Sequence, residues 1–143
     1  MKAGPGRRRT ADVSLAQGLY YTGTGLWPIV SMRSFERVTG PKRDRWLVKT
    51  VGVLVSAIGM TLARSGRRGR VHPDVALLGG LSAAALAAID LVYVARRRIS
   101  PVYLLDAVPE VMLAVWWGRR VARSGRAVWR APVRSSREEV SDT

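Results

Sequence analysis

The sequence predicts an all-α integral membrane protein, a bundle of four membrane-spanning helices. The chain has 143 residues, the size of one domain, and 48% of them are hydrophobic. Its net charge of +14 lies in blocks of Arg and Lys rather than on amphipathic elements. These blocks separate four nearly uncharged runs, each close to the ~20 residues that a helix needs to cross a bilayer. Basic loops between apolar runs are typical of membrane proteins.

The four expected spans cover residues 13–32, 46–63, 75–95 and 99–118. Each is expected to be helical, because a helix in lipid satisfies its own backbone hydrogen bonds. The first span is diluted by glycine and threonine, but it lacks a signal-peptide cleavage pattern, so we interpret it as an uncleaved anchor. Asp44 and Ser100 are the expected N-caps of the second and fourth spans, and Pro101 suits the first turn after Ser100.

Three tryptophans lie near span ends, where amphipathic rings prefer the membrane interface: Trp46, Trp116 and Trp117. Between the first two spans, apolar residues recur at helical spacing over Met32–Thr39, and Gly40 and Pro41 follow as a stop signal. This pattern predicts a short interfacial helix. An irregular basic loop is the alternative, and the sequence does not decide between them.

The charge distribution predicts the orientation. A basic N-terminal tail (residues 1–12), the second loop and a basic, then acidic C-terminal tail (residues 119–143) carry more Lys and Arg than the other two loops. The positive-inside rule places both tails in the cytoplasm, on either side of a four-span domain at residues 13–118. Arg far outnumbers Lys and Asn is absent, which is typical of GC-rich bacterial genomes. We therefore expect a multi-pass protein of the bacterial inner membrane.

Four ionisable residues remain inside the expected spans, where a lone charge costs roughly 2.5–3.5 kcal/mol at a helix centre. They are Lys49, Asp90, Asp106 and Glu110. Lys49 shares a helical face with Gly52, Ser56 and Gly59, and Asp90 shares one with Gly79, Ala83 and Ala87. Small residues mark close helix packing in membranes, so these charges are expected to point into the bundle, with Lys49 paired to a neighbouring carboxylate. Glu110, near mid-membrane, is expected to be protonated or to face a water-filled cavity.

Two further polar groups complete the candidate intramembrane site. Pro28 frees the backbone carbonyl of Thr24, and Pro109 frees that of the residue before Asp106. Tyr103 lies on the same helical face as Asp106 and Glu110. The sequence therefore predicts one polar layer to which every span contributes.

This layer supports two functional hypotheses. In the first, the polar intramembrane site binds a small solute, a lipid headgroup or a proton. In the second, the protein is a structural or assembly subunit whose buried charges only order the helices. We find no catalytic motif and expect no enzyme. With no cysteine and one histidine, we expect no metal site and no cofactor.

The expected partners follow from the same features. The spans contact the lipid bilayer, and the basic tails attract anionic lipids. We expect no nucleic acid, because the basic residues lie in loops between spans. A homo-oligomer or a partner membrane protein is left open by the sequence.

Two segments carry a resemblance: "GLYYTGTGLWPIVSMRSFERVTGPKRDRWLVKTVGVLV" and "AAIDLVYVARRRISPVYLLDAVPE". They resemble small four-helix membrane proteins of bacteria, which are distantly similar to the DoxX-like bundles. The similarity covers roughly Leu15 to Trp117 and leaves both tails outside. It implies the four-helix membrane fold, and it implies no catalytic residue because that group has no settled activity.

Overall fold

The computed structural model describes residues 4–128, and within this range the chain is helical with no strand. The elements are α1 (Pro5–Val30), α2 (Met32–Thr39), α3 (Arg45–Arg67), α4 (Pro73–Ala95), the 3-10 turn η1 (Pro101–Tyr103) and α5 (Leu104–Val128). The expected all-α class is confirmed. Parts of the two expected tails, residues 1–3 and 129–143, lie outside the described residues.

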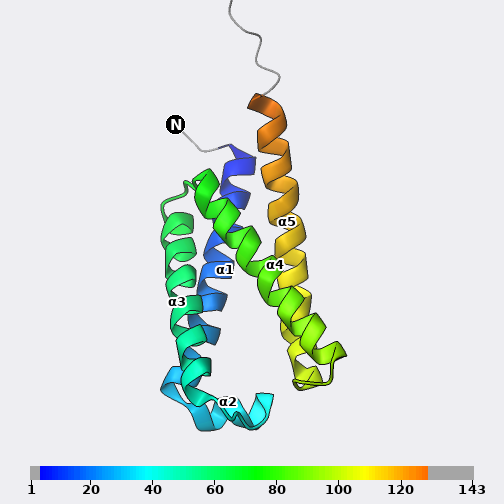
Figure 1. Cartoon of the computed structure of the whole chain (residues 1–143). Helices are drawn as coiled ribbons and strands as arrows, with labels where there is room; N and C mark the ends of the chain where they lie inside the picture. Colours follow the sequence, from blue (N-terminus) through cyan, green and yellow to red (C-terminus); the bar gives the residue numbers. More distant parts are fainter. Residues whose placement is uncertain (1–3, 129–143) are drawn as a thin grey trace, which may run out of the picture.

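The long helices are arranged as two antiparallel pairs, α1 with α3 and α4 with α5 (Figure 1). The short helix α2 lies at one end of the molecule, where it joins α1 to α3. The start of α1, the α3–α4 loop and the last turns of α5 lie together at the opposite end. Both pairs therefore run along the long axis of the molecule.

The first pair is held by glycines on both helices. Gly18 and Gly25 on α1 face Gly59 and Gly52 on α3, all at heptad spacing. A Cβ added at Gly18 would lie 2.3 Å from the backbone nitrogen of Ala63, and one at Gly59 would lie 2.6 Å from that of Thr22. The two backbones thus touch directly, which only glycine permits.

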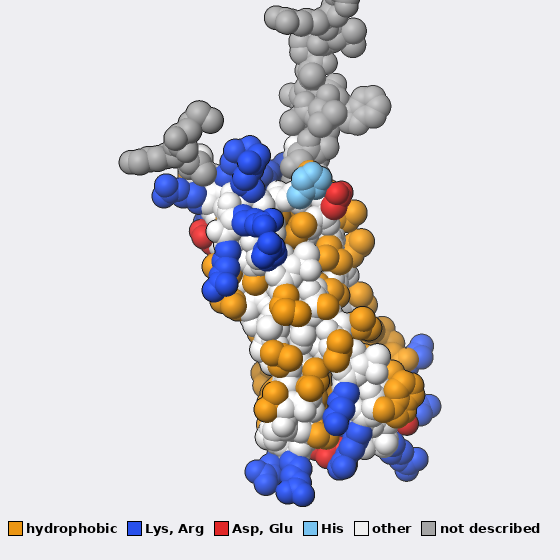
Figure 2. Space-filling model, turned by 90° about the vertical axis from the view of Figure 1, so that its left-hand side faces the viewer, with side chains coloured by type: hydrophobic (Ala, Val, Ile, Leu, Met, Phe, Trp, Pro, Cys, Tyr) orange, Lys and Arg blue, Asp and Glu red, His pale blue; other side chains and the backbone are white. Residues whose placement is uncertain are grey.

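Most of the buried side chains are small or polar, with Tyr21, Leu62 and Trp117 as large exceptions, whereas many large apolar side chains lie on the outside. The buried residues include several alanines and polar groups such as Ser14 and Gln17. Leucine, valine and methionine side chains are exposed along every long helix, and Figure 2 shows them between two basic ends. Within residues 4–128, two helices, α3 and α4, are long and apolar enough to cross a membrane.

Several local predictions are confirmed. Residues Met32–Thr39 form α2, so the irregular-loop alternative is wrong, and Gly40 ends the helix with a positive φ of 85°. The Ser100 hydroxyl accepts a hydrogen bond from the backbone N–H of Val102, although the cap opens η1 rather than an α-helix. Asp44 occupies the N-cap position of α3, but its side chain makes no capping hydrogen bond.

The prediction for Trp117 is wrong. The side chain is 0% exposed and lies between helices rather than at an interface. Its indole N–H donates to Oε1 of Gln17 at 2.7 Å, and this buried acceptor explains its position. The described helices also extend past the expected spans, since α1 begins at Pro5 and α5 continues to Val128.

Candidate functional site

Three carboxyl groups gather between the helix pairs. Asp90 lies near the end of α4, on the buried face that also carries Gly79, Ala83 and Ala87. Asp106 and Glu110 lie one turn apart on α5. Asp90 is 7% exposed and Glu110 is 1% exposed. We call these three residues the acidic cluster.

Two adjacent tyrosines of α1 reach across to the cluster. The Tyr21 hydroxyl donates to Oε2 of Glu110 at 2.7 Å, and the Tyr20 hydroxyl donates to Oδ1 of Asp106. Tyr21 is itself 1% exposed. Because a buried carboxyl without a donor is costly, these hydroxyls stabilise both carboxyl groups and tie α1 to α5.

Asp90 is the incompletely satisfied member of the cluster. Its Oδ2 is the one buried side-chain oxygen or nitrogen among the described residues that has no hydrogen-bond partner. The neighbouring ionisable group is the carboxyl of Asp106 on α5. No group of three or more His, Asp or Glu residues in the described range is arranged to hold a metal ion.

Further polar contacts continue from the cluster toward the other end of α1. Gln17 accepts from Trp117 and donates from Nε2 to the backbone oxygen of Gly79 at 3.0 Å. Beyond it, Nε of Arg120 donates to Oγ1 of Thr10 at 3.1 Å. One face of α1 thus carries a row of hydrogen-bonding side chains directed at α4 and α5.

Lys49 does not join the cluster, and the prediction of its burial and pairing is wrong. Its side chain is exposed, whereas Gly52, Ser56 and Gly59 of the same expected face are buried. No hydrogen bond or ion pair links Lys49 to a carboxylate within residues 4–128. The reason is the packing of α3, whose glycine face meets α1 and not the helix that carries Asp106 and Glu110.

Thr24 and Tyr103 lie at the edge of the cluster instead of inside it. Together with Tyr20 and Asp106 they line a groove of about 250 Å³. The Thr24 hydroxyl donates to the backbone oxygen of Tyr20 at 2.9 Å, so it does not contact a carboxyl group. The centroid of the Tyr103 ring lies 4.9 Å from Nζ of Lys42. The groove gives Asp106 a route to the exterior near α2.

The sequence reasoning missed Tyr20, Tyr21 and Gln17. The signal was available, because polar side chains recur at helical spacing along α1 at residues 10, 14, 17, 21 and 24. In a membrane helix such a stripe is expected to face other helices rather than lipid. Glycines on the adjacent face mark where α3 packs.

No family model, curated protein or solved structure matches this chain. The geometry of the acidic cluster and of the helix ends therefore carries the functional argument alone.

Proposed function

We propose that the chain is a four-span protein of the bacterial inner membrane whose acidic cluster binds and exchanges a proton. The four-helix membrane bundle, the cytoplasmic termini and the resemblance to small four-helix bacterial membrane proteins all belong to this proposal. Of the ligands that the sequence suggested, a proton suits three neighbouring carboxyls best. An anionic lipid headgroup would be repelled by them.

The distribution of side chains supports the membrane assignment. A soluble protein rarely exposes this many large apolar side chains in one zone, yet here they lie along the middle of the molecule between two basic ends (Figure 2). Close packing through glycine and alanine is typical of membrane helices, because lipid supplies no hydrophobic force between them. The helices α1 and α5 would then join α3 and α4 as spans.

One observation carries the site assignment, which is the partnerless oxygen of Asp90 beside Asp106. Buried polar atoms in a scaffold are normally satisfied, and one that is not calls for a functional explanation. A proton shared between Asp90 and Asp106 would satisfy this oxygen when bound and leave it unsatisfied when released. The groove at Asp106 supplies a path for exchange.

The second candidate is the structural subunit. It is favoured by the two tyrosine hydroxyls, which satisfy Glu110 and Asp106 as a static helix contact would require. A scaffold needs only a neutral hydrogen-bonding group at position 110, whereas a proton site needs a group that changes charge. The two candidates therefore differ in what Glu110→Gln does.

Single-cysteine labelling tests the membrane part of the proposal, because the chain has no cysteine of its own. Val38 and Ala122 are exposed at opposite ends of the molecule. In intact cells, Val38→Cys should react with an impermeant thiol reagent and Ala122→Cys should be protected. The reverse pattern would invert the orientation, and labelling of both positions would reject a spanning chain.

Proton uptake tests the site. Purified protein in micelles is given a rapid acid pulse in weak buffer, and a pH indicator dye reports the protons taken up. The loss of rapid proton uptake should be larger in Glu110→Gln than in Asp12→Asn, because coupled carboxyl groups titrate together. Asp12→Asn is the control, since it removes an exposed carboxyl outside the cluster. If Glu110→Gln and Asp90→Asn both fold and take up protons as fast as the wild type, the proton site is rejected and the structural subunit remains.

A further inference from the structure

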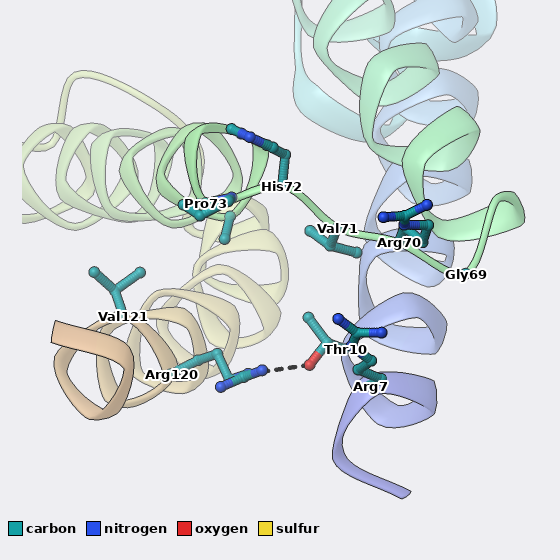
Figure 3. A pocket seen from close by; sticks show the side chains of 10 residues that line it. Arg7, Thr10, Gly69, Arg70, Val71, His72, Pro73, Arg120 and Val121 are labelled. Atoms are coloured by element: carbon teal, nitrogen blue, oxygen red, sulfur yellow. Dashed lines mark hydrogen bonds between the residues drawn. The ribbon is translucent and has the colours of Figure 1, made fainter. Parts of the chain in front are cut away.

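A basic cleft lies at the end of the molecule where α1 begins and α5 ends. It has a volume of about 410 Å³ and is formed by α1, the α3–α4 loop, the first turn of α4 and α5. Figure 3 shows Arg7 and Arg120 reaching toward Thr10 from two different helices, with Arg70 on the loop beside them. The acidic cluster lies near the other end, so the cleft is a separate feature.

The charged side chains that line the cleft are all basic. None of the described residues that line it is acidic. The nearest carboxylate in sequence, Asp74, lies 3.1 Å from Nδ1 of His72, and both side chains are exposed. Positive charges held together in this way attract an anion.

The positions of the arginines suit a compact oxyanion. Arg120 is fixed by its hydrogen bond to Thr10, whose hydroxyl in turn donates to the backbone oxygen of Gly6 at 2.8 Å. Arg7 and Arg70 are exposed and make no ion pair with a described acidic residue. Guanidinium groups bind phosphate oxygens through paired, charge-assisted hydrogen bonds.

We propose that this cleft binds a phosphate group, with Arg7 and Arg70 donating to its oxygens beside the Thr10–Arg120 pair. The phosphate belongs either to a lipid headgroup at the membrane surface or to a free solute. The proposal does not depend on the acidic cluster. It differs from general attraction of basic tails to anionic lipid, because it requires particular arginines.

The chain offers a matched control for this requirement. Arg8 follows Arg7 and Arg68 precedes Arg70 within the loop region, yet neither lines the cleft. The double variant Arg7→Gln/Arg70→Gln and the control Arg8→Gln/Arg68→Gln therefore remove equal charge from the same end. Arg70→Gln alone serves if the first double variant does not fold, since Arg70 lies outside the helices.

Two arms distinguish the source of the phosphate. In the first, native mass spectrometry counts phosphatidylglycerol retained by protein released from mixed lipid and detergent. In the second, binding of radiolabelled inorganic phosphate is measured in nanodiscs of phosphatidylcholine. Loss of two charge-assisted contacts should weaken binding by at least about tenfold in the cleft variant, with little change in the control.

Selective loss in the first arm supports a lipid phosphate, and selective loss in the second supports a free one. Equal losses in both double variants would overturn the proposal, since surface charge alone would explain them. The proposal would also be overturned if neither probe bound the wild-type protein saturably.

Discussion

The two sides of α1 make opposite kinds of contact. Toward α3 it presents Gly18 and Gly25, and the backbones approach so closely that a single added carbon meets main-chain atoms. Toward α5 it presents Tyr20 and Tyr21, which bridge a wider space by hydrogen bonds to carboxyl groups. The first contact depends on shape and tolerates no added atom, whereas the second depends on hydrogen bonds, which the proposed function would make responsive to protons. One helix thus combines a rigid seam with an adjustable one.

The largest effect is expected on the rigid seam. In Gly59→Ala the added Cβ would lie 2.6 Å from the backbone nitrogen of Thr22 and 2.8 Å from the backbone oxygen of Gly18, so the helices must separate. We expect a loss of about 3 kcal/mol or more in the free energy of unfolding, measured by denaturant titration in mixed micelles.

The matched control is Gly23→Ala on α1, where an added Cβ meets nothing within 4 Å. This change should be neutral or stabilising, because alanine favours a helix over glycine. Equal losses at positions 59 and 23 would show that the seam is not the source of the effect.

A smaller effect is expected on the adjustable seam. Tyr21→Phe removes the hydroxyl that donates to Glu110 and leaves that buried carboxyl with one partner fewer. The free energy of unfolding should fall by about 1–2 kcal/mol in the same assay. Tyr93→Phe, at an exposed position on α4, should change it little. An unchanged free energy of unfolding in Tyr21→Phe would mean that water replaces the hydroxyl.

The end of the molecule near α2 should respond weakly to acid. Arg45 donates two hydrogen bonds to Glu36 and, with help from Lys42, lowers the pKa of that carboxyl. Because the folded pKa is depressed, this contact stabilises the fold above the ordinary carboxyl pKa and is lost as pH falls through the lowered value. Arg45 is exposed and Glu36 is partly exposed, so water screens the pair, and the effect should be confined to faster amide exchange in Met32–Thr39. Arg45→Gln should abolish this pH dependence, and a response that persists would have another origin.

The smallest effect is expected at Lys49. Since its side chain is exposed, Lys49→Met should change the free energy of unfolding by no more than about 0.5 kcal/mol. A loss of several kcal/mol, relieved by a second change at Asp90 or Asp106, would restore the buried pair that the sequence suggested.

These cases show which features of the structure can be predicted from the sequence. Apolar runs and stop signals predicted the helices well, and α2 in particular, because local periodicity and Gly40 determine where these helices lie. The carboxyl members of the cluster were found because charge within an apolar run is conspicuous. Lys49 was misplaced because a helical face can be read from sequence, but the identity of the helix that covers it cannot.

The tyrosines were missed for a related reason. Tyr20 and Tyr21 look like ordinary members of an apolar run, and only the approach of α5 gives their hydroxyls a role. Trp117 was assigned to an interface by its position in the chain, whereas Gln17 on another helix holds it inside. Contacts between helices distant in sequence decide both.

The most direct test of the adjustable seam is time-resolved infrared spectroscopy of the protein in vesicles after a rapid pH step. Carboxyl groups that exchange protons with water change their C=O absorption promptly, and sealed ones do not. The account predicts a prompt carboxyl signal in the wild type, part of which is lost in Glu110→Gln and in Asp90→Asn. A wild-type signal identical to that of the Asp90→Asn/Glu110→Gln double variant would contradict it.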